Sequence, residues 1–120
     1  MSKIMIVDDE PNILMSLDYM LRKERYDTLI ARNGTEAMDL LQTEVPDLVV
    51  LDIMMPDVNG YEICEYIKST KTFDQTKVIF LSAKSKRADL EKGLALGADA
   101  YMLKPFSTRE LLKEIKNQLS

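Results

Sequence analysis

Histidine is absent from this chain of 120 residues, and cysteine occurs only once, at Cys64. Without histidine the chain cannot carry a Ser-His-Asp or Cys-His catalytic site, a histidine metal ligand or a phosphohistidine of its own. A single cysteine excludes an internal disulfide and any zinc site built from several cysteines. Any catalytic or metal-binding chemistry must therefore rest on carboxylates, hydroxyls and amines.

Long apolar runs and a surplus of basic residues are also missing. No apolar run approaches the ~20 residues that span a bilayer, and the N-terminus lacks the features of a signal peptide. We therefore expect a cytoplasmic protein without membrane association. Sixteen Lys and Arg against twenty Asp and Glu give a net charge of −4. This balance argues against direct nucleic-acid binding, because phosphate backbones are held by clustered positive charge.

The length suits one domain over residues 1–120, and its pattern predicts an α/β fold. Short runs rich in β-branched and other apolar residues alternate with segments whose apolar residues have helical spacing. Such alternation predicts a three-layer, doubly wound, five-stranded parallel sheet with helices on both faces. The strands are expected at residues 4–7, 28–31, 48–51, 78–81 and 100–103.

Several helix ends are marked in the sequence. A cap-forming acid before Pro11 predicts the start of the first helix. Gly97 predicts the end of the fourth helix, expected over residues 87–96. Ser107 followed by Glu110 forms the pattern of a capping box at the start of the last helix, which is expected to reach Leu119.

Reactive side chains follow four of the five expected strands. Asp8 and Asp9 come after the first strand, Asp52 after the third, Ser82 after the fourth and Lys104 after the fifth. In an open parallel sheet, ligands bind beyond the carboxyl ends of the strands. We therefore expect three carboxylates, a hydroxyl and an amine to converge at one end of the sheet.

This set of groups suits Mg²⁺ and phosphoryl transfer. Close carboxylates repel one another, and Mg²⁺ binds oxygen ligands while keeping several waters. A carboxylate at such a site can act as a nucleophile, and phosphoryl transfer needs mainly positioning and charge neutralisation. Each residue also has a plainer interpretation. Asp9 or Glu10 could cap a helix and Asp52 could belong to a turn, so the inference rests on the joint pattern.

Together these motifs resemble a response-regulator receiver domain of bacterial two-component signalling, over essentially all 120 residues. The matching fragments are Ile6-Val7-Asp8-Asp9-Glu10, Val50-Leu51-Asp52-Ile53-Met54-Met55-Pro56, Asn59-Gly60, Leu81-Ser82-Ala83, Gly97-Ala98-Asp99-Ala100-Tyr101 and Lys104-Pro105-Phe106. The resemblance implies a CheY-like, flavodoxin-like sheet with the strand order 2-1-3-4-5.

The resemblance also implies a role for each site residue. Asp52 would be the phosphoacceptor, and Asp9 and Asp52 would bind Mg²⁺ directly. The Met54 backbone carbonyl would be a further ligand, and Asp8 would act largely through water. Lys104 would contact the phosphoryl group, and its bond to Pro105 would be cis.

Ser82 and Tyr101 would form the conformational switch that the resemblance implies. Ser82 would move to the phosphoryl group and Tyr101 would follow inward. Without the resemblance, Tyr101 would be interpreted as a half-buried aromatic residue with its hydroxyl in water.

The function implied is that of a phosphoacceptor signalling domain. A sensor histidine kinase or histidine phosphotransfer protein would supply phosphohistidine. The face formed by the fourth helix, fifth strand and fifth helix would then change shape and bind an output domain or target protein. Such a chain is not an enzyme in the ordinary sense, because it catalyses only its own phosphorylation and dephosphorylation.

Four positions bear on regulation. Receivers of winged-helix transcription factors usually have an aspartate where Ala100 stands and an arginine where Glu114 stands, and these charges pair across their activated dimer. These two differences argue against that dimer here, without excluding a phosphorylation-dependent dimer. Side chains at the positions of Met54 and Lys84 are expected to tune the lifetime of the phosphate, in a direction that the sequence does not predict.

Rival functions fit less well. A haloacid-dehalogenase-type phosphatase needs a second Asp where Met54 stands, and a flavodoxin needs a Ser/Thr-rich phosphate loop where Asp8-Asp9-Glu10 stands. Walker-type and dinucleotide-binding glycine motifs are missing. The remaining alternative is a module that works by docking, with phosphorylation incidental. Both a stand-alone regulator and the receiver of a longer protein fit the sequence.

Overall fold

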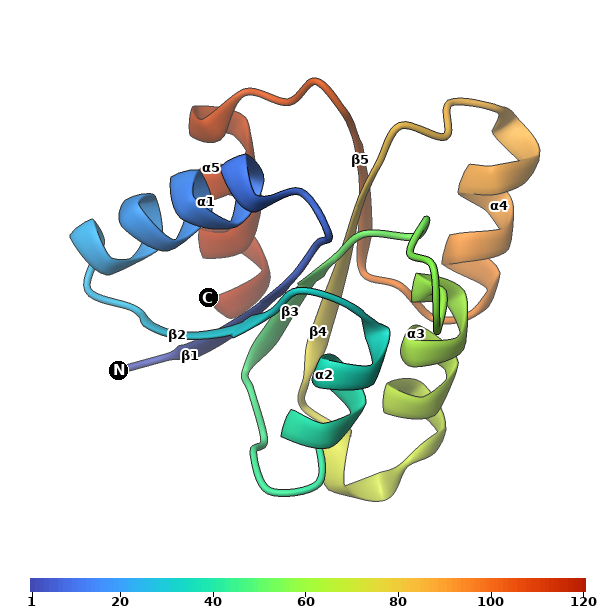
Figure 1. Ribbon diagram of the computed structural model, residues 1–120, viewed down its shortest axis with the longest axis horizontal. Coiled ribbons are helices and arrows are strands. Elements are labelled where there is room, and N and C mark those ends of the chain that lie inside the picture. The colour runs from blue at the N-terminus through green and yellow to red at the C-terminus, as the bar shows by residue number, and fades with distance from the viewer.

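A computed structural model describes all 120 residues as a three-layer α/β domain (Figure 1). Five strands form one sheet in the order β2-β1-β3-β4-β5, and every neighbouring pair is parallel. The predicted strand order is therefore confirmed. The strands are β1 (Lys3–Val7), β2 (Asp27–Ala31), β3 (Leu48–Leu51), β4 (Lys77–Ser82) and β5 (Ala100–Leu103).

Five helices cover the two faces of this sheet (Figure 1). Helices α1 and α5 lie on one face, and α2, α3 and α4 lie on the other. A short 3₁₀ turn, η1 (Lys71–Phe73), connects α3 to β4. The helices are α1 (Pro11–Lys23), α2 (Gly34–Leu40), α3 (Gly60–Ser69), α4 (Arg87–Ala95) and α5 (Thr108–Leu119).

Each face of the sheet has its own hydrophobic core, because successive side chains of a strand point to opposite faces. Ile4 and Ile6 of β1 pack with buried leucines of α1 and α5, whereas Met5 and Val7 pack on the side of α2 and α3. The central strands are thus buried on both sides, as the continuous apolar runs predict. This rigid double-sided packing holds the strand ends in place.

The register of the sheet brings the predicted site residues together. Val7 of β1 pairs with Leu51 of β3, so Asp8 and Asp52 follow at the same level. On the other side of β3, Ser82 of β4 pairs with Leu103 of β5, and Lys104 comes next. The Lys104 N–H donates to the Ser82 carbonyl at 2.8 Å, which continues the ladder beyond the last strand residue.

Most of the predicted helix ends are present. Gly97 follows α4 with a φ of 101°, a conformation that favours glycine. Ser107 caps α5 by accepting from the Glu110 N–H at 3.3 Å, while no return bond from the Glu110 side chain completes the capping box.

The expected acidic cap of α1 is wrong. The Glu10 side chain makes no capping hydrogen bond. The Asp8 carboxylate instead accepts from the Glu10 N–H at 2.9 Å. Glu10 is drawn elsewhere because the Lys104 ammonium lies 3.5 Å from its carboxylate.

Helix α1 ends in a way that the sequence does not predict. Arg25 has a φ of 67°, in the left-handed region where glycine is preferred. The Arg25 N–H donates to Arg22 and the Tyr26 N–H donates to Leu21, a pattern typical of a Schellman ending. None of the helices is both long and apolar enough to cross a lipid bilayer.

Candidate acidic site at the carboxyl end of the sheet

Three aspartates meet where β1 and β3 end. The carboxylates of Asp8, Asp9 and Asp52 each offer an oxygen within 4.8 Å of the others. Asp8 is 2% exposed and Asp52 is 4% exposed, whereas Asp9 is open to solvent. The convergence predicted for these three residues is therefore present in the structure, with the nucleophile candidate Asp52 at its buried side.

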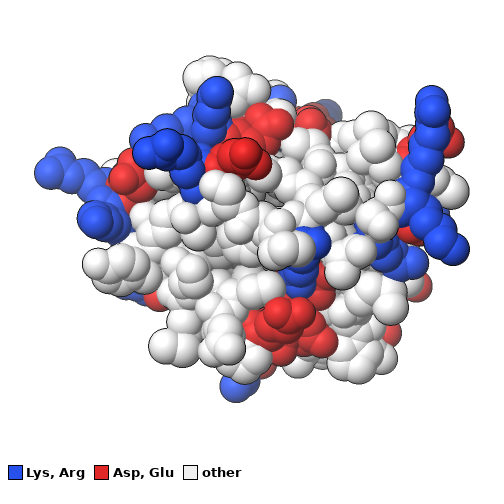
Figure 2. Space-filling model, turned by 90° about the horizontal axis from the view of Figure 1, so that it is seen from above, with Lys and Arg blue, Asp and Glu red and all other residues white.

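Lys104 supplies the positive charge of this cluster. Its ammonium lies 3.0 Å from Asp8, 3.5 Å from Glu10 and 3.6 Å from Asp52. The Lys104–Pro105 peptide bond that follows is cis. Viewed onto this end of the molecule, acidic and basic side chains lie side by side near the middle of a largely uncharged surface (Figure 2).

Burial and mutual repulsion shift the acidity of the site. Burial, and next the charge of Asp8, raise the pKa of Asp52 to about 6, against the attraction of Lys104. Burial also raises the pKa of Asp8. Burial alone would lower the pKa of Lys104, but the carboxylates around it outweigh this effect and raise it. The site thus holds more negative charge than one lysine can neutralise.

A hard divalent cation would relieve this repulsion, and the donor set fits Mg²⁺. Mg²⁺ prefers carboxylate, carbonyl and water oxygens and is commonly bound by one or two carboxylates. Three carboxylates within 4.8 Å, one of them exposed, provide such ligands. With no histidine in the chain and the one cysteine, Cys64, buried in the core, nothing in the site favours a softer metal.

The loop after β3 lies over this cluster. Its two ends are joined by a hydrogen bond from the Gly60 N–H to the Ile53 carbonyl at 2.9 Å. A Cβ at Gly60 would lie only 2.2 Å from the Asp52 carbonyl oxygen, so glycine is needed for this approach. Ile53 and Met55 are buried and the Met54 side chain is exposed between them. This alternation leaves Met54 at the rim of the site.

Ser82 and Tyr101 lie on either side of the segment after β4. The fully buried Ser82 hydroxyl oxygen accepts from the Lys84 N–H at 3.1 Å. The half-buried Tyr101 hydroxyl donates to the Lys84 carbonyl at 2.9 Å, so it is not free in water. Both residues predicted for the switch therefore contact the same backbone position.

An aromatic row lies beneath α4. Tyr61, Phe80 and Tyr101 follow one another with ring centroids 5.6 and 5.9 Å apart. Gly93, the one buried residue of α4, lies against this row, where a Cβ would come within 3.0 Å of Phe80. Helix α4 thus rests on Tyr101 through a glycine, with little buried side-chain surface of its own.

Two participants were not predicted from the sequence as site residues. Glu10 approaches Lys104, although its position before proline suggested only a helix cap. Asp57 in the loop after β3 accepts hydrogen bonds from Gly34 and Thr35 at the start of α2. No local sequence signal could have found this second contact, because the partners lie more than twenty residues apart.

The comparisons with known proteins agree with this geometry. The family model described as response regulator receiver domain matches residues 4–116. The chain is similar to the beryllofluoride-activated receiver domain of DrrB, with 38% identity and a TM-score of 0.91 over 99% of this chain and 97% of that chain. It covers 52% of a longer DrrB chain from Thermotoga maritima, an OmpR/PhoB homologue, at 38% identity and a TM-score of 0.90.

The chemotaxis regulator CheY4 of Vibrio cholerae has 27% identity and a TM-score of 0.92, over 99% of each chain. The family match and the similarity of fold therefore agree. The chain belongs to the response regulator receiver domains, the CheY-like domains of two-component signalling.

Proposed function

We propose that this domain accepts a phosphoryl group on Asp52 and signals by the resulting change of shape. The observation that carries the proposal is the environment of Asp52. Its carboxylate is almost fully buried beside two further aspartates, and Lys104 lies 3.6 Å away. A structural aspartate has no need of two like charges next to it, because they only raise the free energy of the folded protein.

The acceptor reaction follows from the groups present. An Asp52 oxygen forms a bond to the phosphorus of a phosphohistidine, the phosphorus–nitrogen bond breaks, and its electron pair returns to the imidazole of the donor. Lys104 neutralises charge on the phosphoryl oxygens and on the carboxylates around them. Mg²⁺, held by Asp9, Asp52 and the Met54 carbonyl, with Asp8 acting largely through water, would supply further neutralisation of the same charge when bound.

The switch begins at Ser82. Its hydroxyl accepts from Lys84 in this structure, which leaves its own proton free to be donated to a phosphoryl oxygen. A shift of Ser82 would disturb Lys84, whose carbonyl holds the Tyr101 hydroxyl. Tyr101 packs on Phe80 beneath α4, so the movement would reach this helix.

The face that carries the output is formed by α4, β5 and α5. Leu90, Leu94 and Leu103 on α4 and β5 are large apolar side chains that are exposed to solvent. An output domain or target protein would bury such side chains on binding. We propose that phosphorylation changes the affinity of this face for its partner by favouring one of two shapes.

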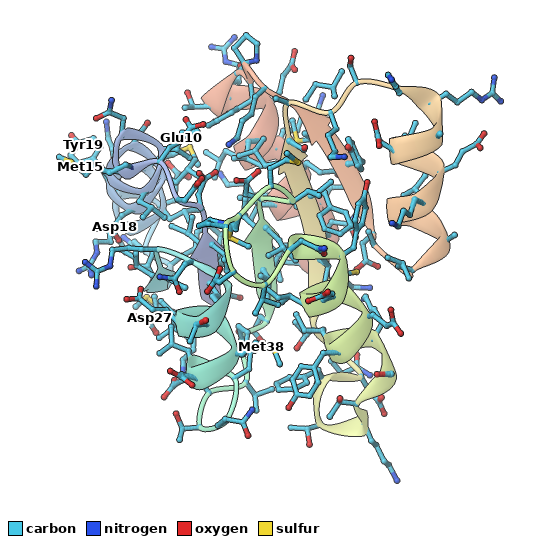
Figure 3. The ribbon with its side chains drawn as sticks, turned by 45° about the vertical axis from the view of Figure 1, so that its right-hand side comes forward. Glu10, Met15, Asp18, Tyr19, Asp27 and Met38 are labelled. Carbon is cyan, nitrogen blue, oxygen red and sulfur yellow. The ribbon has the colours of Figure 1, made fainter.

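The donor would approach from the side of α1. This helix begins two residues after Asp9, and Glu10, the residue before its first turn, lies with its carboxylate 3.5 Å from the Lys104 ammonium. Met15 and Tyr19, one helical turn apart, project outward and are 72% and 70% exposed (Figure 3). A sensor histidine kinase or phosphotransfer protein seated on this apolar pair would place its phosphohistidine near Asp52. We also propose that the domain acts in the cytoplasm, because the kinases that would supply its phosphoryl group use ATP there.

The catalytic role proposed for the chain is limited to its own phosphorylation and dephosphorylation. The experiment is intact mass spectrometry after incubation with acetyl phosphate, with and without Mg²⁺. We expect one phosphoryl adduct that requires Mg²⁺ and is lost in Asp52→Asn. A Lys104→Ala variant should still bind Mg²⁺ but fail to change shape.

Two results would count against the proposal. If Asp52→Asn formed as much phosphoryl adduct as the wild type, the acceptor would be another residue. Absence of any adduct, together with failure to bind beryllofluoride, would favour a module that works by docking without phosphorylation.

A further inference from the structure

The carboxylate of Asp57 joins two parts of the chain that are distant in sequence. It accepts from the Gly34 N–H at 3.1 Å, from the Thr35 N–H at 2.8 Å and from the Thr35 hydroxyl. The two N–H groups belong to the first turn of α2, where backbone donors have no partner within the helix and a carboxylate can satisfy them. The hydrogen bonds hold the pKa of Asp57 well below its usual range, with the Thr35 hydroxyl as the largest cause. Asp57 is therefore ionised under all ordinary conditions.

The loop and α2 also touch directly beside this carboxylate. A Cβ at Gly34 would lie 2.3 Å from the Val58 carbonyl oxygen and 2.6 Å from the Val58 Cβ. These are distances that no side chain tolerates. The loop can thus contact α2 because Gly34 has no side chain, and the hydrogen bonds of the Asp57 carboxylate stabilise this contact.

This loop carries Met54, whose backbone carbonyl is the proposed third protein ligand of Mg²⁺. Its base is closed by the bond between Gly60 and Ile53, and Met55 is buried in the core. Beyond Met55, the polar contacts between the loop tip and the rest of the fold are those of Asp57. Without these hydrogen bonds, only apolar contacts would hold residues 56–58 against α2.

We propose that Asp57 is a positioning residue, which fixes the loop after β3 to the start of α2 and so holds the Met54 carbonyl where Mg²⁺ is bound. This inference rests on the proposed function. A ligand held in place needs no ordering when the metal binds, so part of the affinity comes from the contacts that hold it. Asp57 itself does not touch the metal or the phosphoryl group.

The test measures Mg²⁺ affinity by calorimetry and by backbone amide NMR shifts, with thermal unfolding in parallel. We expect Asp57→Ala to weaken Mg²⁺ binding about tenfold, the lower end of the loss seen when a group that holds a metal ligand in place is removed. Asp57→Asn keeps an acceptor oxygen and should lie between this variant and the wild type. Asp74→Ala, at another exposed aspartate, is the matched control and should leave Mg²⁺ affinity unchanged.

Gly34→Ala tests the same contact from the side of α2. Its methyl group forces the loop away while every carboxylate stays present, so we expect a similar loss of Mg²⁺ affinity. A merely structural role would lower the unfolding temperature of the Asp57 and Gly34 variants and leave the Mg²⁺ affinity of their folded forms unchanged, and that result would overturn the inference.

The wild type and Asp52→Asn separate this inference from the proposed function. If the wild type binds Mg²⁺ and Asp52→Asn binds it weakly, but Asp57→Ala binds as well as the wild type, only the inference about Asp57 is wrong. If the wild type binds no Mg²⁺, the proposed metal-dependent function and the inference are both wrong.

Discussion

Asp52 is the residue at which electrostatic repulsion and burial act most strongly. Its carboxylate shares a small volume with Asp8 and Asp9, and Lys104 is the one cation within 4 Å of it. Such an arrangement lowers the stability of the metal-free protein at neutral pH, as is typical of a functional site. A raised pKa at Asp52 is the signature of this conflict.

Removal of the acceptor charge should therefore stabilise the protein. The pKa of Asp52 is about 6 in the folded protein and about 4 in an unfolded chain. Between these values the folded protein keeps a proton that the unfolded chain has lost, so this contribution to stability is present below about pH 4 and is lost as the pH rises through about 6. We expect Asp52→Asn to be more stable than the wild type at pH 7, by roughly 3 kcal/mol at most, with little difference near pH 4.

Urea unfolding between about pH 4 and 8, with a chelator present, measures this difference. Asp74→Asn is the control, because Asp74 is exposed and forms no ion pair. A stabilisation of Asp52→Asn that does not vary with pH would contradict the electrostatic explanation.

At the scale of single elements, the end of α1 stores backbone strain. Arg25 is the one non-glycine residue with positive φ, and its exposed side chain forms no ion pair that would explain arginine there. The cost of this conformation for a residue with a Cβ is about 1 to 2 kcal/mol.

Arg25→Gly should stabilise the protein by about 0.5 to 1 kcal/mol. The strain energy relieved in the folded protein exceeds the free-energy cost of glycine's extra conformational freedom in the unfolded chain. Thermal unfolding measures this, and Arg25→Ala, which keeps the strain, should show no gain. Equal behaviour of the two variants would show that the side chain, not the backbone, determines the effect.

Helix α4 is the element whose packing depends most on the absence of a side chain. Alanine at Gly93 would place a methyl group 3.0 Å from the Phe80 ring and 3.2 Å from the Tyr101 ring. Overpacking of this kind costs about 1 to 3 kcal/mol, against a gain of about 1 kcal/mol in helix propensity.

We expect Gly93→Ala to lower the free energy of unfolding by about 1 kcal/mol and to change the near-ultraviolet circular dichroism of the tyrosines. Leu94→Ala, at an exposed site on the same helix, is the control and should leave the spectrum unchanged. If Gly93→Ala were more stable than the wild type and its near-ultraviolet spectrum were unchanged, α4 would be able to shift and accommodate the methyl group without cost.

At the scale of the whole molecule, two cores on a single sheet hold the site rigid while one face keeps exposed leucines. The face of α4, β5 and α5 carries Leu90, Leu94 and Leu103. Ala100 at the start of β5 is buried and has no charge, and Glu114 on α5 is acidic. The pair of opposite charges that joins activated winged-helix regulators is therefore missing at these two positions.

We expect Mg²⁺ and beryllofluoride not to promote dimer formation through this face, because exposed leucines without matching charges do not fix one mode of pairing. Sedimentation velocity with and without beryllofluoride measures this. A dimer that forms only with beryllofluoride and disappears in Leu94→Ala would show that apolar contacts of this face suffice.

The strands and most helix ends could be predicted because their signals are local. Apolar runs mark the strands, and Gly97 and Ser107 mark helix ends through their own backbone and side-chain chemistry. The end of α1 at Arg25 could not be predicted, because tertiary packing of Tyr26 and β2 outweighs the local preference for glycine. The side chain of Glu10 was misassigned for a similar reason, since Lys104 attracts it from a distant part of the chain.

The sequence by itself determined the order of βα units, and with it that Asp8, Asp9, Asp52, Ser82 and Lys104 share one end of the sheet. Parallel strands with right-handed crossovers leave no other place for residues that follow strands. Only the tertiary structure decided which groups touch there: Lys104 with Glu10, Tyr101 with Lys84, and Asp57 with the start of α2. These contacts join segments far apart in the chain, so loop geometry and side-chain packing, not local pattern, determine them.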